Sequence, residues 1–136
     1  MKNSAWILPE SEKKYTIRER KKRGFMSSDC IFCKIANKEI STNLIYEDEN
    51  VVAFNDLSPQ ATTHFLVIPK KHYASLNEID NDEVFANIFS AVPKIAAKLG
   101  IKEYRTVVNT GASAGQTVFH IHVHVMAGRE FTWPAG

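Results

Sequence analysis

The sequence contains little cysteine and no long apolar run. Two of its 136 residues are cysteines, and they lie close together as Cys30 and Cys33. Because this pair is too close in sequence to join distant parts of a fold, we expect no disulfide framework. No apolar run approaches the roughly 18 residues of a transmembrane helix, and no signal-peptide stretch opens the chain. These absences predict a cytoplasmic protein without a membrane partner, for which an additional nuclear location stays open.

Charge is unevenly distributed along the chain, although the net charge is only +2. Residues 1–25 hold eight Lys or Arg against three Glu, which leaves an acidic remainder. The basic run RERKKRG (18–24) is typical of nuclear-localisation or nucleic-acid-contacting arms, and more often of solvated, disordered tails. We therefore predict a basic, disordered extension over residues 1–28, in which Met26 offers an alternative start, and a single domain over residues 29–136. No nucleic-acid contact is expected outside the extension.

Hydrophobic periodicity predicts antiparallel strands and one packed helix. Apolar residues recur at helical spacing from an N-cap at Asp80 or Asn81 to Leu99, and Pro93 is placed to bend this helix. The β-rich runs predict a hairpin around residues 47–50 and strands over His64–Pro69, Tyr104–Asn109 and Gln116–Met126. With 44% hydrophobic residues the chain is able to form one core, and the predicted class is α+β.

Three of the five histidines stand at every second position near the end of the chain, as His120, His122 and His124 in VFHIHVHVMAG. Side chains alternate between the two faces of a strand, so a strand here places the three imidazoles on one face and the intervening apolar residues on the other. A solvent-exposed polar face would explain one such histidine. Three in register favour chemistry, because imidazole is a nucleophile, proton carrier or metal ligand near neutral pH.

Two kinds of chemistry fit this row of histidines. Histidines at positions i and i+2 of a strand are able to share a catalytic zinc ion, but the sequence offers few nearby carboxylates for a general base. The glycine-containing loop Gly111–Gly115, just before the row, offers backbone N–H groups to an anionic phosphate. The combination favours phosphorus chemistry, in which one histidine attacks and another stabilises the developing charge.

Five motifs carry a resemblance to a known family: HIHVHVM, CIFCKI, FNDLSPQATTHFLVIPKKH, NTGASAGQTVFHIHVHV and the terminal WPAG. HIHVHVM has the His-x-His-x-His-x-x form, with apolar x, of the histidine triad (HIT) superfamily of nucleotide hydrolases and transferases. Together the motifs resemble the Hint branch, the purine nucleoside phosphoramidases, over Asp29–Gly136. The resemblance implies the α+β HIT fold, an antiparallel sheet with a packed amphipathic helix. It also implies a homodimer in which the C-terminal segment reaches the neighbouring active site.

The resemblance also implies a role for each matching residue. His122 attacks the α-phosphorus of a nucleoside phosphoramidate and forms a nucleotidyl-histidine, from which water releases the nucleoside monophosphate, AMP or GMP. His124 holds the phosphate oxygens, and Thr117, where many Hint enzymes have serine, hydrogen-bonds the phosphate or assists the leaving amine. The implied nucleotide-binding residues are Ile31, Phe32, Phe54, Asp56, Leu57, Asn109, Gly115, Gln116, Thr117, His122, His124 and Trp133.

Within this set, the residues divide by the part of the nucleotide they are expected to contact. Asp56 is expected to accept hydrogen bonds from the ribose hydroxyls, and Asn109 to position the ribose phosphate. Ile31 and Leu57 would enclose the purine together with the two phenylalanines, for which ordinary core packing is an equal alternative. Trp133 would help to select the leaving group across the dimer.

The cysteines gain a role through the same resemblance. Microbial HIT proteins bind a structural zinc ion through such a cysteine pair, a histidine before LVIP and the first histidine of the triad. The implied tetrahedral set here is Cys30, Cys33, His64 and His120. From the residues alone, a redox pair or two buried thiols also remain open. His72 is expected at the surface, and no organic cofactor is expected.

Two other functions remain open from the sequence. One is a dinucleoside polyphosphate hydrolase of the Fhit type, against which the WPAG ending argues. The other is a regulatory or interaction protein whose nucleotide site is secondary. The intact set of His122, His124, Thr117 and Asn109 favours retained catalysis.

Overall fold

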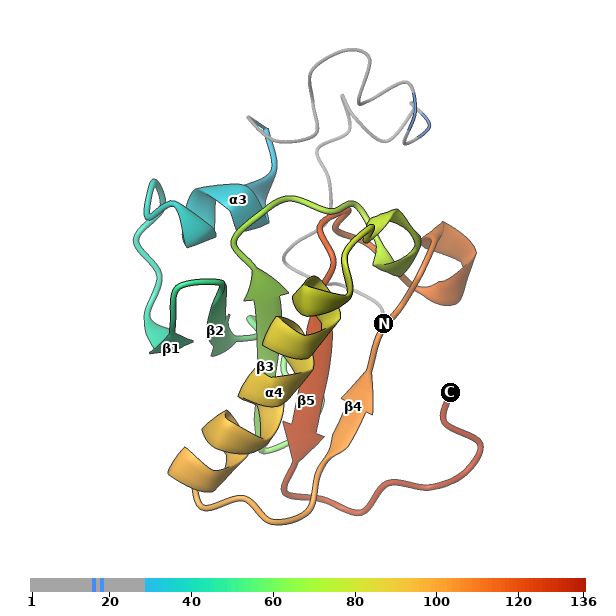
Figure 1. Cartoon of the computed structure of the whole chain (residues 1–136). Helices are drawn as coiled ribbons and strands as arrows, with labels where there is room; N and C mark the ends of the chain where they lie inside the picture. The colour runs from blue at the N-terminus through green and yellow to red at the C-terminus, as the bar shows by residue number, and fades with distance from the viewer. Residues whose placement is uncertain (1–15, 17, 19–28) are drawn as a thin grey trace.

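The computed structural model describes Thr16, Arg18 and residues 29–136. The predicted disordered extension therefore lies, apart from those two residues, outside the part of the chain that the structure describes. A five-stranded antiparallel sheet forms the centre of the described part, with strand order β1-β2-β3-β5-β4. A long helix, α4, crosses one face of this sheet (Figure 1). This arrangement confirms the predicted α+β class.

The elements follow the chain in a simple order. They are α3 (Ile31–Ala36), β1 (Leu44–Glu47), β2 (Val51–Asn55), β3 (Thr63–Pro69), the 3-10 helix η1 (Leu76–Glu78), α4 (Asp82–Lys98), β4 (Arg105–Val107), the 3-10 helix η2 (Ala112–Ala114) and β5 (Val123–Ala127). The predicted hairpin is the pair β1 and β2, which is antiparallel. None of the described helices combines the length and apolarity needed to cross a membrane.

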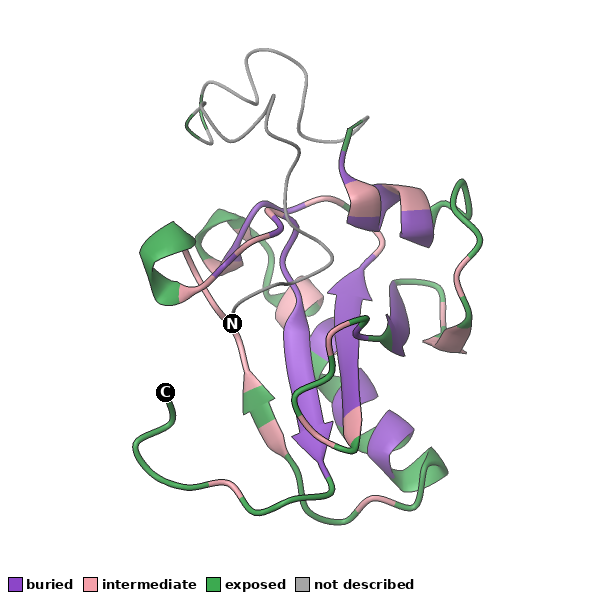
Figure 2. Ribbon diagram, turned by 180° about the vertical axis from the view of Figure 1, so that it is seen from behind, coloured by how far each residue is buried: buried purple, intermediate pink, exposed green. Residues whose placement is uncertain are grey.

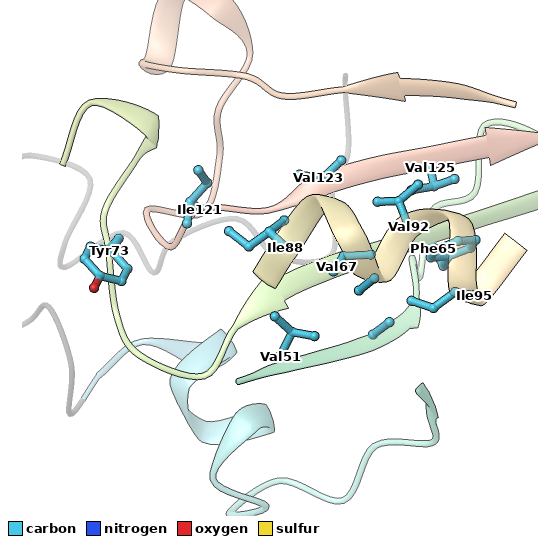
Figure 3. Close-up of a cluster of buried hydrophobic side chains, with 12 residues drawn as sticks. Val51, Phe65, Val67, Tyr73, Ile88, Val92, Ile95, Ile121, Val123 and Val125 are labelled. Atoms are coloured by element: carbon cyan, nitrogen blue, oxygen red, sulfur yellow. The ribbon is translucent and has the colours of Figure 1, made fainter. Parts of the chain in front are cut away.

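Helix α4 begins and ends where the sequence predicts. The side chain of Asn81 caps it by accepting a hydrogen bond from the backbone N–H of Glu83 at 2.8 Å. Acidic residues in its first turn and Lys98 in its last turn complement the helix dipole. Pro93 lies inside the helix. The apolar face of α4 packs on the sheet through Ile88, Val92 and Ile95 (Figure 3).

Alternation along the strands divides the buried residues into two clusters, one on each face of the sheet. The cluster beneath α4 contains Val51, Ala53, Phe65, Val67, Val123 and Val125 (Figure 3). The cluster beneath α3 contains Phe32, Cys33, Val52, Phe54, Leu66 and Ile68. Strands β3 and β5 are buried along most of their length (Figure 2). Because side chains alternate, His64 of β3 and His124 of β5 lie on the face opposite α4.

The predicted last strand, Gln116–Met126, is wrong in its first part. Strand β5 begins only at Val123, so His124 alone of the three histidines belongs to regular sheet. The preceding segment leaves the ladder because the N–H of Ile121 donates to the carbonyl of Tyr73, at 2.7 Å, in the chain that follows β3. The side chain of His120 lies beside Cys30 and Cys33, at the start of α3.

Candidate active site and metal centre

Two cysteines and two histidines form a cluster at the N-terminus of α3. Nδ1 of His120 lies 3.4 Å from Sγ of both Cys30 and Cys33, and Nδ1 of His72 lies 3.2 Å from Sγ of Cys33. Cys30 is the N-cap of α3, and its sulfur accepts the N–H of Cys33 at 3.4 Å, which keeps both sulfurs on one side of the helix end. The four ligand atoms lie within 4.8 Å of one another.

The donor set and its spacing fit a tetrahedral zinc ion. Zinc–sulfur and zinc–nitrogen bond lengths place ligand atoms about 3.3–3.8 Å apart, close to the distances in this cluster. Nε2 of His120 lies 2.8 Å from the carbonyl oxygen of Pro69. Since a carbonyl only accepts, Nε2 carries the proton and Nδ1 presents its lone pair to the cysteines. Metal-binding histidines usually donate the proton of their other ring nitrogen to such a carbonyl, which fixes the tautomer and the orientation of the ring.

The pKa shifts of the two cysteines also bear on the binding of a cation. A hydrogen bond from Cys33 lowers the pKa of Cys30 in spite of burial. The same hydrogen bond, together with burial, raises the pKa of Cys33. The direction of the shift at Cys30 favours the thiolate, which is the form that binds metals.

The predicted metal set is corrected at one position. His64 was expected as the fourth ligand, but it lies in a different cluster, and His72 takes its place beside the cysteines. His64 lies at the start of strand β3 (Thr63–Pro69) and His72 just beyond its end, and the end at Pro69 is the one beside His120. The prediction of His72 as a surface residue is also wrong, because its ring is half-buried and packs edge-on against that of His120 with centroids 5.0 Å apart.

The second cluster contains His64, His124 and Asp56, all buried. Nε2 of His64 lies 2.9 Å from Nδ1 of His124 and 3.5 Å from Oδ2 of Asp56. Burial lowers the pKa of His64 and that of His124, the latter to about 3. Both imidazoles are therefore neutral at physiological pH.

His122 lies between the two clusters. Its Nδ1 lies 2.8 Å from the carbonyl oxygen of His120, so Nδ1 donates and Nε2 is left with a free lone pair. Burial lowers the pKa of His122, which keeps the ring neutral and its lone pair available. The rings of Phe32 and His124 pack edge-on against it, with centroids at 5.2 and 5.0 Å. His122 is thus a buried, oriented, neutral imidazole, as a nitrogen nucleophile requires.

Comparison with known proteins places this arrangement in a family. The HIT domain family matches residues 37–131. This protein belongs to the HIT family. A HIT-like protein of Synechococcus elongatus is 46% identical over 114 residues, which cover 82% of this chain and 100% of that protein. A HIT family hydrolase of Legionella pneumophila, with a solved structure, has 48% identity and a TM-score of 0.75 over 79% of this chain and 99% of its own.

A second solved structure agrees. A histidine triad protein of Clostridium difficile is 45% identical, with a TM-score of 0.74 over 77% of this chain and 95% of its own. The HIT fold is therefore confirmed. The two cysteines at residues 30 and 33 lie before the stretch that matches the HIT domain family, so the family match itself does not include them.

Several predicted nucleotide-binding residues of this HIT protein have clear structural roles. Phe32 and Phe54 are fully buried and pack edge-on with centroids 5.4 Å apart, so both belong to the core. Gln116 is buried, and its amide donates to the carbonyls of Ala74 and Val118 at 2.7 and 3.0 Å. Its Oε1 also accepts the N–H of Gly111 at 2.9 Å, so Gln116 fixes the loop that precedes the histidines.

Most of the remaining predicted residues lie at or near the surface, and Asp56 is the buried one. Ile31, Asn109, Gly115 and Thr117 are half-buried, Leu57 is exposed and Trp133 is 84% exposed. Asp56 is buried, with Oδ1 accepting the N–H of Ser58 at 2.8 Å. The pairing of His64 with His124 was not predicted from the sequence. The signal for it was the position of His64 at the start of β3, the strand that pairs with β5.

Proposed function

We propose that this HIT protein is a hydrolase of the Hint type that cleaves the P–N bond of purine nucleoside 5′-phosphoramidates. The observation that carries the proposal is the state of His122, a buried neutral imidazole whose Nδ1 is held by the carbonyl of His120. Its Nε2 is free to form a bond to the α-phosphorus while the P–N bond breaks and the amine departs. Water then cleaves the nucleotidyl-histidine and releases the nucleoside monophosphate. The relatives named HIT family hydrolases support the hydrolase class.

The groups around His122 support binding of a nucleotide. His124 and Thr117 are proposed to hold the phosphate oxygens, and the Gly111–Gly115 loop to approach the phosphate with its backbone. Asp56 is proposed to read the ribose hydroxyls, which a carboxylate accepts as a pair. The bound nucleotide is proposed to resemble AMP or GMP. The exposed side chain of Leu57 is proposed to cover its purine ring.

A structural zinc ion is proposed at Cys30, Cys33, His72 and His120, on the strength of the donor spacing and of the His120 tautomer. When bound, zinc would crosslink the start of the domain to the segment that carries the nucleophile. It would leave the lone pair of His122 free for reaction.

A homodimer of the Hint kind is also proposed. In a single chain Trp133 is 84% exposed, which suits a side chain that completes a neighbouring site. In that arrangement Trp133 would contact the leaving group of the substrate held by the partner subunit.

The test compares two substrates side by side on the purified, zinc-loaded protein. We expect fast cleavage of an adenosine 5′-phosphoramidate, slow cleavage of a diadenosine polyphosphate, and loss of turnover in His122→Ala. A preference for the dinucleotide would assign the protein to the Fhit type instead. No turnover of either substrate by protein that binds AMP would favour a regulatory nucleotide-binding role.

A further inference from the structure

The cluster of Asp56, His64 and His124 has the composition of a second metal site. Two imidazoles and a carboxylate, with ligand atoms within 4.8 Å of one another, form a common set for divalent metals. All three side chains are nearly inaccessible, with exposed fractions of 7%, 2% and 3%. Which ring nitrogen carries a proton decides whether the cluster binds a metal or forms a chain of hydrogen bonds.

A backbone contact decides the protonation of His64. The N–H of Gln60 lies 3.0 Å from Nδ1 of His64 and is able only to donate. Nδ1 therefore accepts, and the single proton of the neutral ring resides on Nε2. Burial lowers the pKa of His64, which keeps the ring in this neutral form. A metal at Nε2 would have to displace that proton and leave an imidazolate, so the backbone contact opposes metal binding.

The proton on His64 then fixes the proton on His124. Nε2–H of His64 lies 2.9 Å from Nδ1 of His124, so it donates and Nδ1 accepts. Oδ2 of Asp56, at 3.5 Å from the same Nε2, favours a proton there as well. The proton of neutral His124 is consequently on Nε2. That atom is buried and has no hydrogen-bond partner among the described residues.

A buried donor without a partner costs free energy unless a ligand satisfies it. Nε2 of His124 belongs to a ring packed edge-on against His122, with centroids 5.0 Å apart. In the proposed reaction, an oxygen of the phosphoryl group attacked by His122 would be a strong acceptor beside this ring. A phosphoryl oxygen bound there would satisfy the Nε2–H donor of His124.

We propose that His64 is a positioning residue that sets the tautomer of His124, through the relay Gln60 N–H to His64 to His124, so that His124 presents a neutral Nε2–H to a phosphoryl oxygen. The cluster with Asp56 is thus a hydrogen-bond relay and does not bind a metal. The inference rests on the proposed function only for the identity of the acceptor, since the tautomers are properties of the free protein.

The direct test is nuclear magnetic resonance of the full-length, zinc-loaded protein labelled with ¹⁵N in histidine. Two-bond ¹⁵N–¹H correlations distinguish Nδ1–H from Nε2–H rings, and His124→Asn assigns the signals of that residue. We expect Nε2–H for both His64 and His124. An Nδ1–H tautomer of His124 in the wild-type protein would overturn the proposal, whatever the protein hydrolyses.

Two variants of His64 separate positioning from simple packing. His64→Leu fills the same space with an apolar side chain and removes the donor, and we expect mixed tautomers of His124 and a fall in kcat/KM of about 10²-fold, the usual scale for one lost transition-state donor. His64→Gln keeps an N–H at a similar place, and we expect the Nε2–H tautomer and a loss of about tenfold at most. A His124 that stays Nε2–H in His64→Leu would show that His64 does not set the tautomer.

Metal titration tests the second part of the proposal. We expect one equivalent of Zn²⁺ in both the wild-type protein and Asp56→Asn. A second equivalent that is lost in Asp56→Asn would show that the cluster is a metal site and overturn the relay. Failure of phosphoramidate turnover with the expected tautomers would count against the proposed function alone.

Discussion

Nδ1 of His122 lies 2.8 Å from the carbonyl oxygen of His120, whose own side chain belongs to the cysteine cluster. One residue thus contributes its imidazole to the candidate metal centre and its backbone to the candidate nucleophile. Nε2 of His120 is fixed in turn by the carbonyl of Pro69 at 2.8 Å. The orientation of His122 therefore depends on a segment that the cysteine cluster holds in place.

The amount of bound zinc distinguishes His72, which lies beside the cysteines, from His64, which was predicted as the ligand from the sequence. We expect His72→Gln to lose bound zinc and His64→Gln to keep one equivalent, because only His72 lies beside the cysteines. At free zinc 100-fold above the Kd, loss of binding lowers the free energy of unfolding by about 2.7 kcal/mol. Atomic absorption of the purified proteins and urea unfolding measure both effects. Chelation should destabilise the wild-type protein and leave His72→Gln unchanged, whereas zinc loss in His64→Gln would contradict the corrected ligand set.

Removal of the nucleophile should separate binding from turnover. We expect His122→Gly to lower kcat for an adenosine phosphoramidate by about 10⁴-fold or more, because in the proposed mechanism the imidazole of His122 forms the covalent intermediate. AMP affinity should change little, since binding depends on the surrounding residues. Single-turnover kinetics and calorimetry of AMP binding test this. Loss of AMP binding in a properly folded variant would count against the role of His122.

The sequence predicted those parts of the fold that local patterns determine. The N-cap at Asn81 and the spacing of apolar residues identify α4, and alternation around the polar turn identifies the β1–β2 hairpin. The beginning of β5 was not predicted, because it depends on the hydrogen bond between Ile121 and the carbonyl of Tyr73, two residues far apart in sequence. Local pattern carries no information about such a contact.

Most residues of the candidate site were predicted from the sequence, but one histidine was assigned to the wrong cluster. Cys30, Cys33 and His120 were assigned together and do lie together. The exchange of His64 for His72 arose because both histidines adjoin the same strand. Which one faces the cysteines follows from where the end of β3 lies relative to α3, and that is a property of the folded sheet. The catalytic and nucleotide-binding roles stay predictions.

Stability should fall as the pH is lowered below the ordinary pKa of histidine. Burial first, and then the neighbouring His122, lower the pKa of His124 to about 3 from 6.5. Between these values the unfolded chain binds a proton that the folded chain does not, so the free energy of unfolding rises with pH over this window. His124 alone contributes up to about 1.4 kcal/mol per pH unit. Urea unfolding between pH 5 and about 6.5 should therefore show a smaller slope in His124→Asn, and equal slopes would contradict the neutral, buried His124.

Gly128, directly after β5, has a positive φ and lies close to Thr62, and each of these features favours glycine. Gly111 shares only the first feature, so it serves as a control. The φ of Gly128 is +97°, and an added Cβ would lie 2.6 Å from Cβ of Thr62. Gly111 has a similar φ of +91°, but its Cβ would meet nothing within 4 Å. Alanine at either position incurs the strain of a positive φ, about 1–3 kcal/mol.

Alanine at Gly128 must also displace Thr62, whose hydroxyl donates to the carbonyl of Gly128 at 3.2 Å. We therefore expect Gly128→Ala to destabilise by about 1–3 kcal/mol more than Gly111→Ala, the range for overpacking a close contact. Urea unfolding of the two variants at the same pH and zinc concentration measures the difference. Adding Thr62→Gly to Gly128→Ala removes the obstructing Cβ and should recover part of that excess, because only the positive φ then remains. Equal losses in the two single variants would mean that the turn after β5 moves freely enough to release the contact, and that the close approach to Thr62 does not constrain residue 128.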